Sequence, residues 1–183
     1  MKLDAHQHFW KYNPEEYPWI SKGMEALMRD FLPEDLLKEQ KSVAFDGSIA
    51  VQARQSLQET RWLLELSDTY PLIKGVVGWV DLQSEDLESQ LQEFTSHKKL
   101  VGVRHVIHDE PDVNFMLKPS FMRGIGQLAG YGLTYDLLLF PEHLPNAIKL
   151  VAEFPEQVFI LDHMAKPLIK DQLLSPWDKD MAA

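Results

Sequence analysis

The sequence predicts an α/β fold built around a parallel sheet. Short apolar segments rich in β-branched residues recur along all 183 residues, and each is followed by a polar or amphipathic stretch. These apolar segments are nearly continuous rather than alternating, which is typical of parallel strands covered on both faces. No composition shift or low-complexity linker separates a second domain. We therefore expect residues 1–183 to form one domain.

Six segments have the character of strands. The first opens the chain and gives way to a long stretch rich in proline, tryptophan and tyrosine, whose aromatic side chains either form a lid or pack the loop down. The predicted strands are 2–8, 48–53, 73–80, 100–106, 132–138 and 157–162.

Helical signals lie between these strands. Pro33 precedes two acidic residues, a pattern that favours a helix start. Ser56 and Glu59 have the spacing of a capping box, in which each side chain binds the other residue's backbone N–H. The predicted helices are 33–41, 57–70, 86–97, 119–130 and 141–154. Alternation of strands and helices fits either an open doubly wound sheet or a closed barrel. The first strand is followed by His-Gln-His-Phe-Trp instead of a glycine-rich turn, which argues against a dinucleotide site.

Composition excludes several classes of function. The net charge is −10 and no basic stripe is present, which argues against nucleic acid and anionic membranes as partners. No apolar run approaches the roughly 20 residues of a membrane-spanning helix. The first residues lack an apolar leader, so we expect a cytoplasmic protein. With no cysteine, disulfides and thiolate metal ligands are excluded.

Polar residues gather where the predicted strands end. His6 and His8 are two residues apart on a strand, so both imidazoles point to the same face, as a metal or acid–base site requires. In a (β/α)₈ barrel the carboxyl ends of the strands form the active-site face. The other polar residues at or beside strand ends are Gln52, Arg104, His105, His108, Tyr135, Asp136, Asp162, His163 and Lys166, and for Lys166 we expect a role in shaping the turn. His97 and His143 fall in predicted helices and are expected on the surface.

Five motifs carry a resemblance to a known family. They are Asp4-Ala-His-Gln-His-Phe-Trp10, Val51-Gln-Ala53, Gly75-Val-Val-Gly-Trp-Val-Asp-Leu82, Gly102-Val-Arg-His105 and Leu161-Asp-His-Met-Ala-Lys-Pro167. In this order and spacing the sequence resembles the amidohydrolase-related TIM-barrel hydrolases, a group of predicted metal-dependent hydrolases that includes L-fuconolactonase-like sugar-acid lactonases. The resemblance implies a TIM-barrel-like (β/α) fold of which six of the eight βα units are present. It also implies a hydrolase of carbohydrate catabolism that opens a small lactone by water attack.

The resemblance assigns roles to the polar residues. It implies that His6, His8, Arg104 and His163 are catalytic. The histidines, or a metal that they hold, would polarise the carbonyl, and Arg104 would anchor the acid end or the oxyanion. The base would be an aspartate after the eighth strand, which these six units do not include. The residues that the resemblance implies for substrate binding are Gln52, His105, Tyr135 and Asp136.

The same resemblance limits the metal. Binuclear amidohydrolases have a bridging lysine after the fourth strand and a histidine after the fifth, where this sequence has Arg104 and Tyr135-Asp136. An arginine stays charged and is no practical metal ligand. We therefore expect either no required metal or a single divalent ion such as zinc, bound through His6, His8 and His163.

Two alternatives stay open at this point. One is a metal-dependent decarboxylase of the same superfamily, and the other is a non-catalytic remnant that binds a ligand or a partner chain. The expected partner is a small-molecule lactone or sugar acid. The first and sixth strands would have open edges, so we also expect a homo-oligomer formed through these edges.

Overall fold

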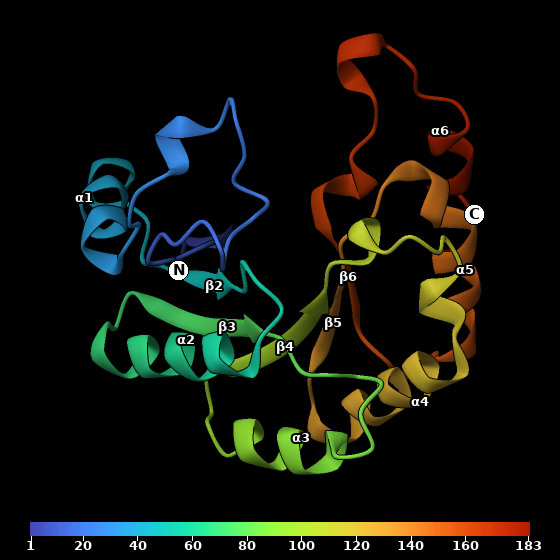
Figure 1. The fold of residues 1–183 in the computed structure, drawn as a ribbon, viewed down its shortest axis with the longest axis horizontal. Coiled ribbons are helices and arrows are strands. Elements are labelled where there is room, and N and C mark those ends of the chain that lie inside the picture. The colour runs from blue at the N-terminus through green and yellow to red at the C-terminus, as the bar shows by residue number, and fades with distance from the viewer. The chain divides into compact units, whose positions relative to one another are not determined.

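The computed structural model describes residues 1–183, and all six predicted strands are present. They are parallel and follow the chain order β1-β2-β3-β4-β5-β6 in one sheet (Figure 1). Each strand is shorter than predicted by one to three residues, because residues at the ends of the predicted segments already belong to loops. The strands are β1 Leu3–Gln7, β2 Gly47–Val51, β3 Ile73–Gly78, β4 Leu100–His105, β5 Thr134–Leu137 and β6 Phe159–Leu161.

Helices follow the strands in the predicted order. The fifth predicted helix begins with a 3₁₀ turn, Pro141–His143, before α5, and β6 is followed by a short α6 of four residues. The helices are α1 Pro33–Val43, α2 Leu57–Thr69, α3 Leu87–Thr95, α4 Pro119–Leu128, α5 Leu144–Glu153 and α6 Trp177–Asp180. The fold is therefore a partial TIM-barrel-like α/β fold with six βα units. None of these helices combines the length and the apolar character needed to cross a membrane.

Contacts divide the chain into two compact units. Unit 1 comprises residues 1–79 and 94–101. In it, β1 pairs with β2 and β2 with β3, and α2 lies against β3 (Figure 1). Thr60 of α2 ties helix to strand, since its hydroxyl donates to the carbonyl of Trp79 and accepts from the Trp79 N–H, both at 2.8 Å. Gly78 permits this approach: a Cβ there would lie 2.6 Å from Thr60 Cγ2.

The long first loop of unit 1 packs on itself. Trp10, Tyr17 and Ile20 form a buried apolar cluster, and the Trp10 indole donates to the Arg29 carbonyl at 2.9 Å. Trp10 also forms an isolated antiparallel bridge with Phe31. These aromatic residues therefore pack the loop down, which is one of the two roles considered for them.

Unit 2 comprises residues 80–93 and 102–183. In it, β4 pairs with β5 and β5 with β6, and α4 packs against the sheet through Phe121, which contacts Tyr135 of β5. Gly124 of α4 sits against the carbonyl of Leu82, where a Cβ would lie 2.1 Å from the oxygen. The glycine is needed for this close packing.

The two histidines expected on the surface differ in burial. His143 is buried rather than on the surface, because the 3₁₀ turn folds its ring back to 3.3 Å from the backbone nitrogen of Phe140. His97 lies at the surface as expected, partly exposed, with its Nε2 2.9 Å from Asp68 Oδ1.

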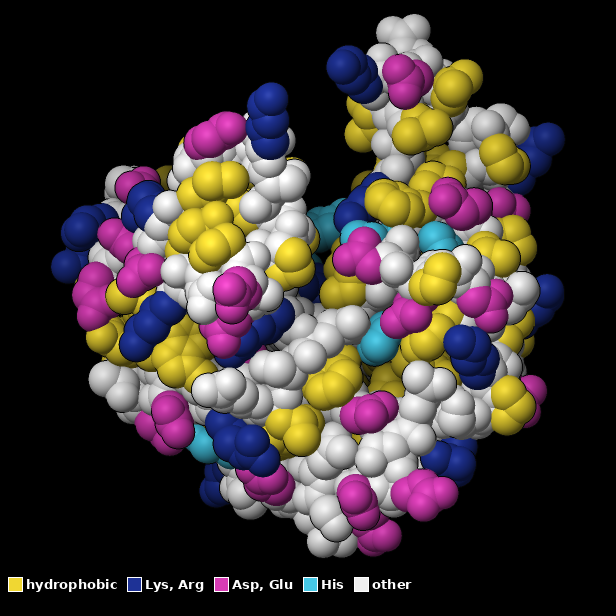
Figure 2. Space-filling model, viewed as in Figure 1, with side chains coloured by type: hydrophobic (Ala, Val, Ile, Leu, Met, Phe, Trp, Pro, Cys, Tyr) yellow, Lys and Arg dark blue, Asp and Glu magenta, His cyan; other side chains and the backbone are white.

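The segment after β6 exposes apolar side chains. Ile169 is 72% exposed and Leu173 is 59% exposed. Figure 2 shows hydrophobic side chains gathering on this C-terminal part of unit 2. This segment therefore has a partly apolar surface.

Candidate active site

His6 and His8 meet in unit 1 as predicted from their spacing. The two Nε2 atoms lie 3.2 Å apart and the rings meet edge to face. His8 Nδ1 lies 2.8 Å from the carbonyl oxygen of Val51. A carbonyl oxygen only accepts, so Nδ1 of His8 carries the proton and its Nε2, which faces Nε2 of His6, is the acceptor nitrogen.

This pair fits a metal ion. Zinc binds imidazole nitrogens at about 2.0–2.1 Å with tetrahedral angles, which places two such nitrogens about 3.3 Å apart. The 3.2 Å between the Nε2 atoms of His6 and His8 agrees with that separation. The bond from His8 to the Val51 carbonyl also fixes its ring, as the outer contacts of metal-binding histidines commonly do. A cavity of about 470 Å³ lies beside His8 and extends toward α1.

Gln52, directly after β2, is fully buried, and its backbone N–H donates to the carbonyl of Val77 at 2.8 Å. The loop that follows is held by Glu59, which was predicted only as part of a helix cap. The buried carboxylate of Glu59 accepts from the backbone N–H of Ala53 at 2.6 Å and from Arg54 Nε at 3.1 Å. Burial raises the pKa of Glu59 to about 7, although these donors oppose the shift.

The predicted capping box is therefore only half present. Ser56 Oγ accepts from the Glu59 N–H at 3.0 Å, as expected. The Glu59 side chain instead turns to the end of β2, because two unpaired backbone N–H groups and the Arg54 guanidinium lie there. Arg54 also pairs with Glu16 of the first loop at 2.7 Å.

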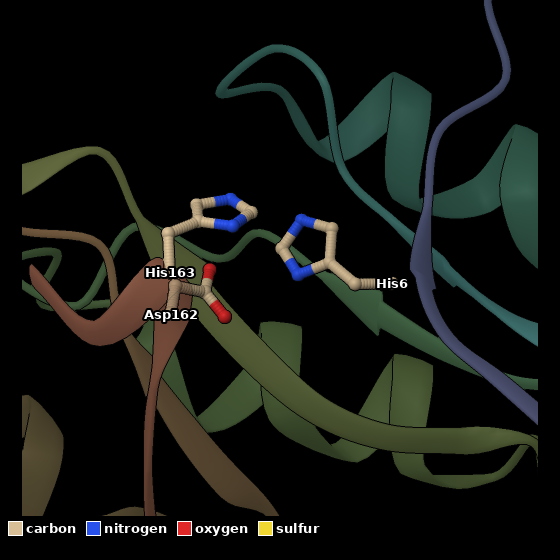
Figure 3. A group of neighbouring side chains, drawn as sticks. All are labelled: His6, Asp162 and His163. Atoms are coloured by element: carbon tan, nitrogen blue, oxygen red, sulfur yellow. The ribbon is translucent and has the colours of Figure 1, made fainter. Parts of the chain in front are cut away.

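Arg104 of unit 2 forms a buried ion pair. Its Nη1 donates to Asp162 Oδ2 at 2.8 Å, and both side chains are almost completely buried. Asp162 directly follows β6 and precedes His163, and Figure 3 shows the two side chains leaving the same short segment. Asp162 was predicted at this strand end without an assigned role. The Asp162-His163 pair follows the sixth predicted strand, at the same sheet edge as Arg104 after the fourth. This shared edge was the sequence signal that could have indicated the ion pair.

His163 occupies a strained turn. It is exposed, and its φ of 51° starts a run of four left-handed residues that ends at Lys166. Left-handed backbone costs a non-glycine residue about 1–2 kcal/mol. The Trp177 indole of α6 holds this turn by donating to the Met164 carbonyl at 2.7 Å. Strain of this kind is concentrated at functional sites.

The four predicted residues of β4 and β5 divide between two faces of the sheet. Arg104 is in register with Asp136, so their side chains share one face, and Asp136 accepts from Thr134 at 3.3 Å. His105 and Tyr135 lie on the other face, where both pack against Phe121 of α4. The structure therefore places His105 and Tyr135 in the core against α4, and their role in substrate binding stays a prediction.

Two more polar residues meet at this end of unit 2. Lys166 Nζ lies 2.9 Å from His108 Nε2. Both residues were predicted at strand ends, but their contact was not predictable, because 58 positions separate them and no local pattern connects them.

Known proteins resemble this chain in sequence and fold. A family model described as Amidohydrolase matches residues 3–183. A Burkholderia multivorans protein named L-fucono-1,5-lactonase is 39% identical over 184 residues, which cover 100% of this chain and 60% of that protein. A Burkholderia ambifaria protein of the same name is 29% identical over 181 residues, which cover 99% of this chain and 62% of that protein.

A solved structure is also similar. The crystal structure of an amidohydrolase from Burkholderia multivorans with bound zinc has a TM-score of 0.94 and 38% identity, covering 99% of this chain and 64% of that one. The chain thus spans about 60% of the length of the two lactonases that it matches. Because the family model matches almost all of its residues, the chain belongs to the amidohydrolase family.

Proposed function

We propose that this chain carries six βα units of a sugar-acid lactonase and that its substrate class is L-fucono-1,5-lactone and similar lactones. The observation that carries this proposal is the match of the whole chain, at 39% identity, to a protein named L-fucono-1,5-lactonase. Such an activity belongs to carbohydrate catabolism.

The proposed reaction is hydrolysis of a cyclic ester. Water adds to the carbonyl carbon, the bond to the ring oxygen breaks, and that oxygen takes up a proton. His6, His8 and His163 remain the proposed catalytic residues because imidazoles can orient the carbonyl and move protons near neutral pH. Arg104 receives a different role: it positions Asp162 through their 2.8 Å ion pair. Gln52 and Asp136 remain the proposed contacts for substrate hydroxyls.

A single divalent ion fits this proposal. The Nε2 atoms of His6 and His8 have the spacing of two zinc ligands, and His163 is the third ligand that the sequence predicts. When bound, such an ion supplies Lewis-acid polarisation of the carbonyl. The proposal also allows catalysis in which the imidazoles act alone.

The test is ring opening of L-fucono-1,5-lactone, followed by proton release at constant pH. We would assay the 183-residue chain alone and joined to the remaining βα units of the Burkholderia multivorans lactonase, because a complete barrel has eight units. The joined protein should open the lactone. His6→Ala or His163→Ala should each lower its kcat/KM by about 10²-fold or more, since a positioned acid–base group contributes at least that much.

His97→Ala is the matched control, because this histidine pairs with Asp68 on the outside of α2 and should leave turnover unchanged. Failure of the joined protein to open any sugar-acid lactone would contradict the proposal. Metal-dependent release of CO₂ from an aromatic acid would favour the decarboxylase instead.

A further inference from the structure

Three strand-end loops of unit 2 bring a lysine, a histidine and a phenylalanine together. His108 follows β4, Phe140 follows β5 and Lys166 follows β6. Lys166 Nζ lies 2.9 Å from His108 Nε2 and 5.0 Å from the centre of the Phe140 ring, and the His108 and Phe140 rings are 4.6 Å apart. We propose that the Lys166 ammonium, held by His108 and Phe140, binds the acyl oxygens of a sugar acid as they become negatively charged. This inference deepens the proposed lactonase function and rests on it.

The hydrogen bond between Lys166 and His108 has one direction. An ammonium group only donates, so His108 Nε2 must accept and its proton must reside on Nδ1. That atom lies 2.9 Å from Asp109 Oδ1, whose charge favours this tautomer. Burial and the charge of Lys166 lower the pKa of His108 and outweigh the opposing effect of Asp109, which favours the neutral ring. Lys166 therefore keeps its positive charge while His108 orients it.

Arg104 is less suited to this task than Lys166. The Arg104 guanidinium is buried and its charge is matched at 2.8 Å by the equally buried Asp162. Lys166 is only partly buried, and its one hydrogen bond goes to a neutral ring instead of a carboxylate. An ammonium has three N–H donors, so two remain for the oxygens of a ligand. Of Arg104 and Lys166, Lys166 is the better placed to bind an anionic ligand, because its hydrogen bond goes to an imidazole and not to a carboxylate.

The backbone around Lys166 fixes where its side chain begins. Lys166 closes the run of four left-handed residues, and its N–H donates to the His163 carbonyl at 2.9 Å. Burial lowers the pKa of Lys166, the charge of Asp109 raises it, and the Arg104–Asp162 pair is close enough for both of its charges to affect this pKa in opposite directions. The strained turn thus holds this ammonium beside the proposed catalytic residues of unit 2.

The charges that develop during lactone hydrolysis determine the role of Lys166. A neutral lactone offers the ammonium little, but the tetrahedral intermediate carries an oxyanion and the product carries a carboxylate. Lys166 keeps its proton throughout and stabilises the negative oxygen. Its removal should therefore lower kcat and weaken product binding while KM for the neutral lactone changes little.

The first experiment uses the 183-residue chain and needs no turnover. Sodium L-fuconate is titrated while the imidazole nitrogen signals of His108 are followed by NMR, with sodium chloride and neutral L-fucose as controls. We expect fuconate, and neither control, to shift the His108 signals. Lys166→Met should weaken fuconate binding at least tenfold, and Lys166→Arg should retain it within a few fold.

Lys170→Met is the matched control, because it removes the same charge from an exposed position four residues away and should bind fuconate normally. If wild-type His108 responds equally to fuconate and chloride, the inference is overturned without any reliance on a variant. It is also overturned if Lys166→Met binds fuconate as well as Lys170→Met does.

The second experiment uses the joined protein described above. Lys166→Met should lower kcat about 10²-fold, the usual effect of losing one oxyanion donor, with KM within about twofold. Lys166→Arg should recover most of the loss. Fuconate binding without lactone turnover would refute the proposed function and leave the anion site, whereas turnover unaffected by Lys166→Met would refute the role of Lys166.

Discussion

Arg104 shows how burial decides what a charged residue can do. From sequence it was a candidate for anchoring the substrate, yet the folded chain places its guanidinium against the buried Asp162 carboxylate. A buried pair of this kind adds little net stability, because desolvation offsets the attraction, but each partner depends strongly on the other.

Removing one member of this pair should therefore destabilise the protein. We expect Arg104→Met to lower the free energy of unfolding by about 3–5 kcal/mol, because it leaves Asp162 charged and buried. Replacing both residues, as Arg104→Met with Asp162→Leu, should recover at least half of that loss. Urea denaturation of the three proteins tests this, and a single variant within 1 kcal/mol of wild type would show that the pair is not desolvated.

The raised pKa of Glu59 predicts that the free energy of unfolding depends on pH between about pH 4.5 and pH 7. Burial raises its pKa from 4.5 to about 7, so between these values the folded state holds a proton that the unfolded chain has lost. The unfolding free energy should therefore fall as pH rises through this window and level off above it. At 1.36 kcal/mol per pKa unit, the contribution is roughly 3 kcal/mol.

The check is chemical denaturation between pH 5 and pH 8. Glu59→Gln cannot titrate and should flatten this part of the profile, while Glu153→Gln on the exposed face of α5 should leave it intact. A profile of Glu59→Gln with the wild-type slope would assign the dependence to another group.

The element with the most unusual backbone is the turn after β6. Four successive residues, His163 to Lys166, have left-handed backbone although none is glycine. The strain energy of this turn is offset by the hydrogen bond from the Trp177 indole and by the burial of Asp162 and Ala165. These two buried residues flank the exposed His163 and Met164. Such a turn holds His163 and Lys166 in fixed positions, which is useful only where side-chain placement matters.

Glycine should relieve part of this strain. We expect Met164→Gly to raise the unfolding free energy by about 1 kcal/mol, since glycine adopts positive φ at no steric penalty and the Met164 side chain is mostly exposed. Met164→Ala removes the same side chain and keeps the penalty, so it should show no gain. Thermal denaturation of both variants compares them directly, and equal stabilities would mean that the turn carries no such strain.

At the scale of the whole molecule, the outer strands of the sheet are β1 and β6. Ile160 of β6 is 45% exposed and the preceding Val158 is 59% exposed. Unpaired edge groups beside exposed apolar side chains favour pairing with another chain. Together with the apolar segment after β6 seen in Figure 2, they make this side of unit 2 prone to association.

We therefore expect the 183-residue chain to form dimers or larger species and to bind a hydrophobic dye such as ANS. Size-exclusion chromatography with light scattering measures the first and fluorescence the second. Ile160→Lys should reduce association, because a charged side chain on an edge strand opposes pairing. Val43→Lys, an exposed site of α1, is the control. A monodisperse monomer without dye binding would show that these edges are protected.

The order of the elements was determined by the sequence itself. Apolar runs such as 73–80 predicted strands, and the signals at Pro33 and Ser56 predicted helix starts, within a few residues, because both kinds of pattern are local. The pairing of His6 with His8 was likewise predictable, since side chains two residues apart share a face of a strand.

Only the tertiary structure decided which polar residues meet. Arg104 pairs with Asp162 and Lys166 with His108, each across 58 positions, and no local pattern records such contacts. The face of the sheet on which Tyr135 and His105 lie depends on strand register, which sequence alone left open between neighbours. Glu59 turned from its predicted cap to the end of β2 because unpaired backbone N–H groups there needed an acceptor. The chemistry of this chain thus depends on long-range packing, while its βα order depends on local pattern.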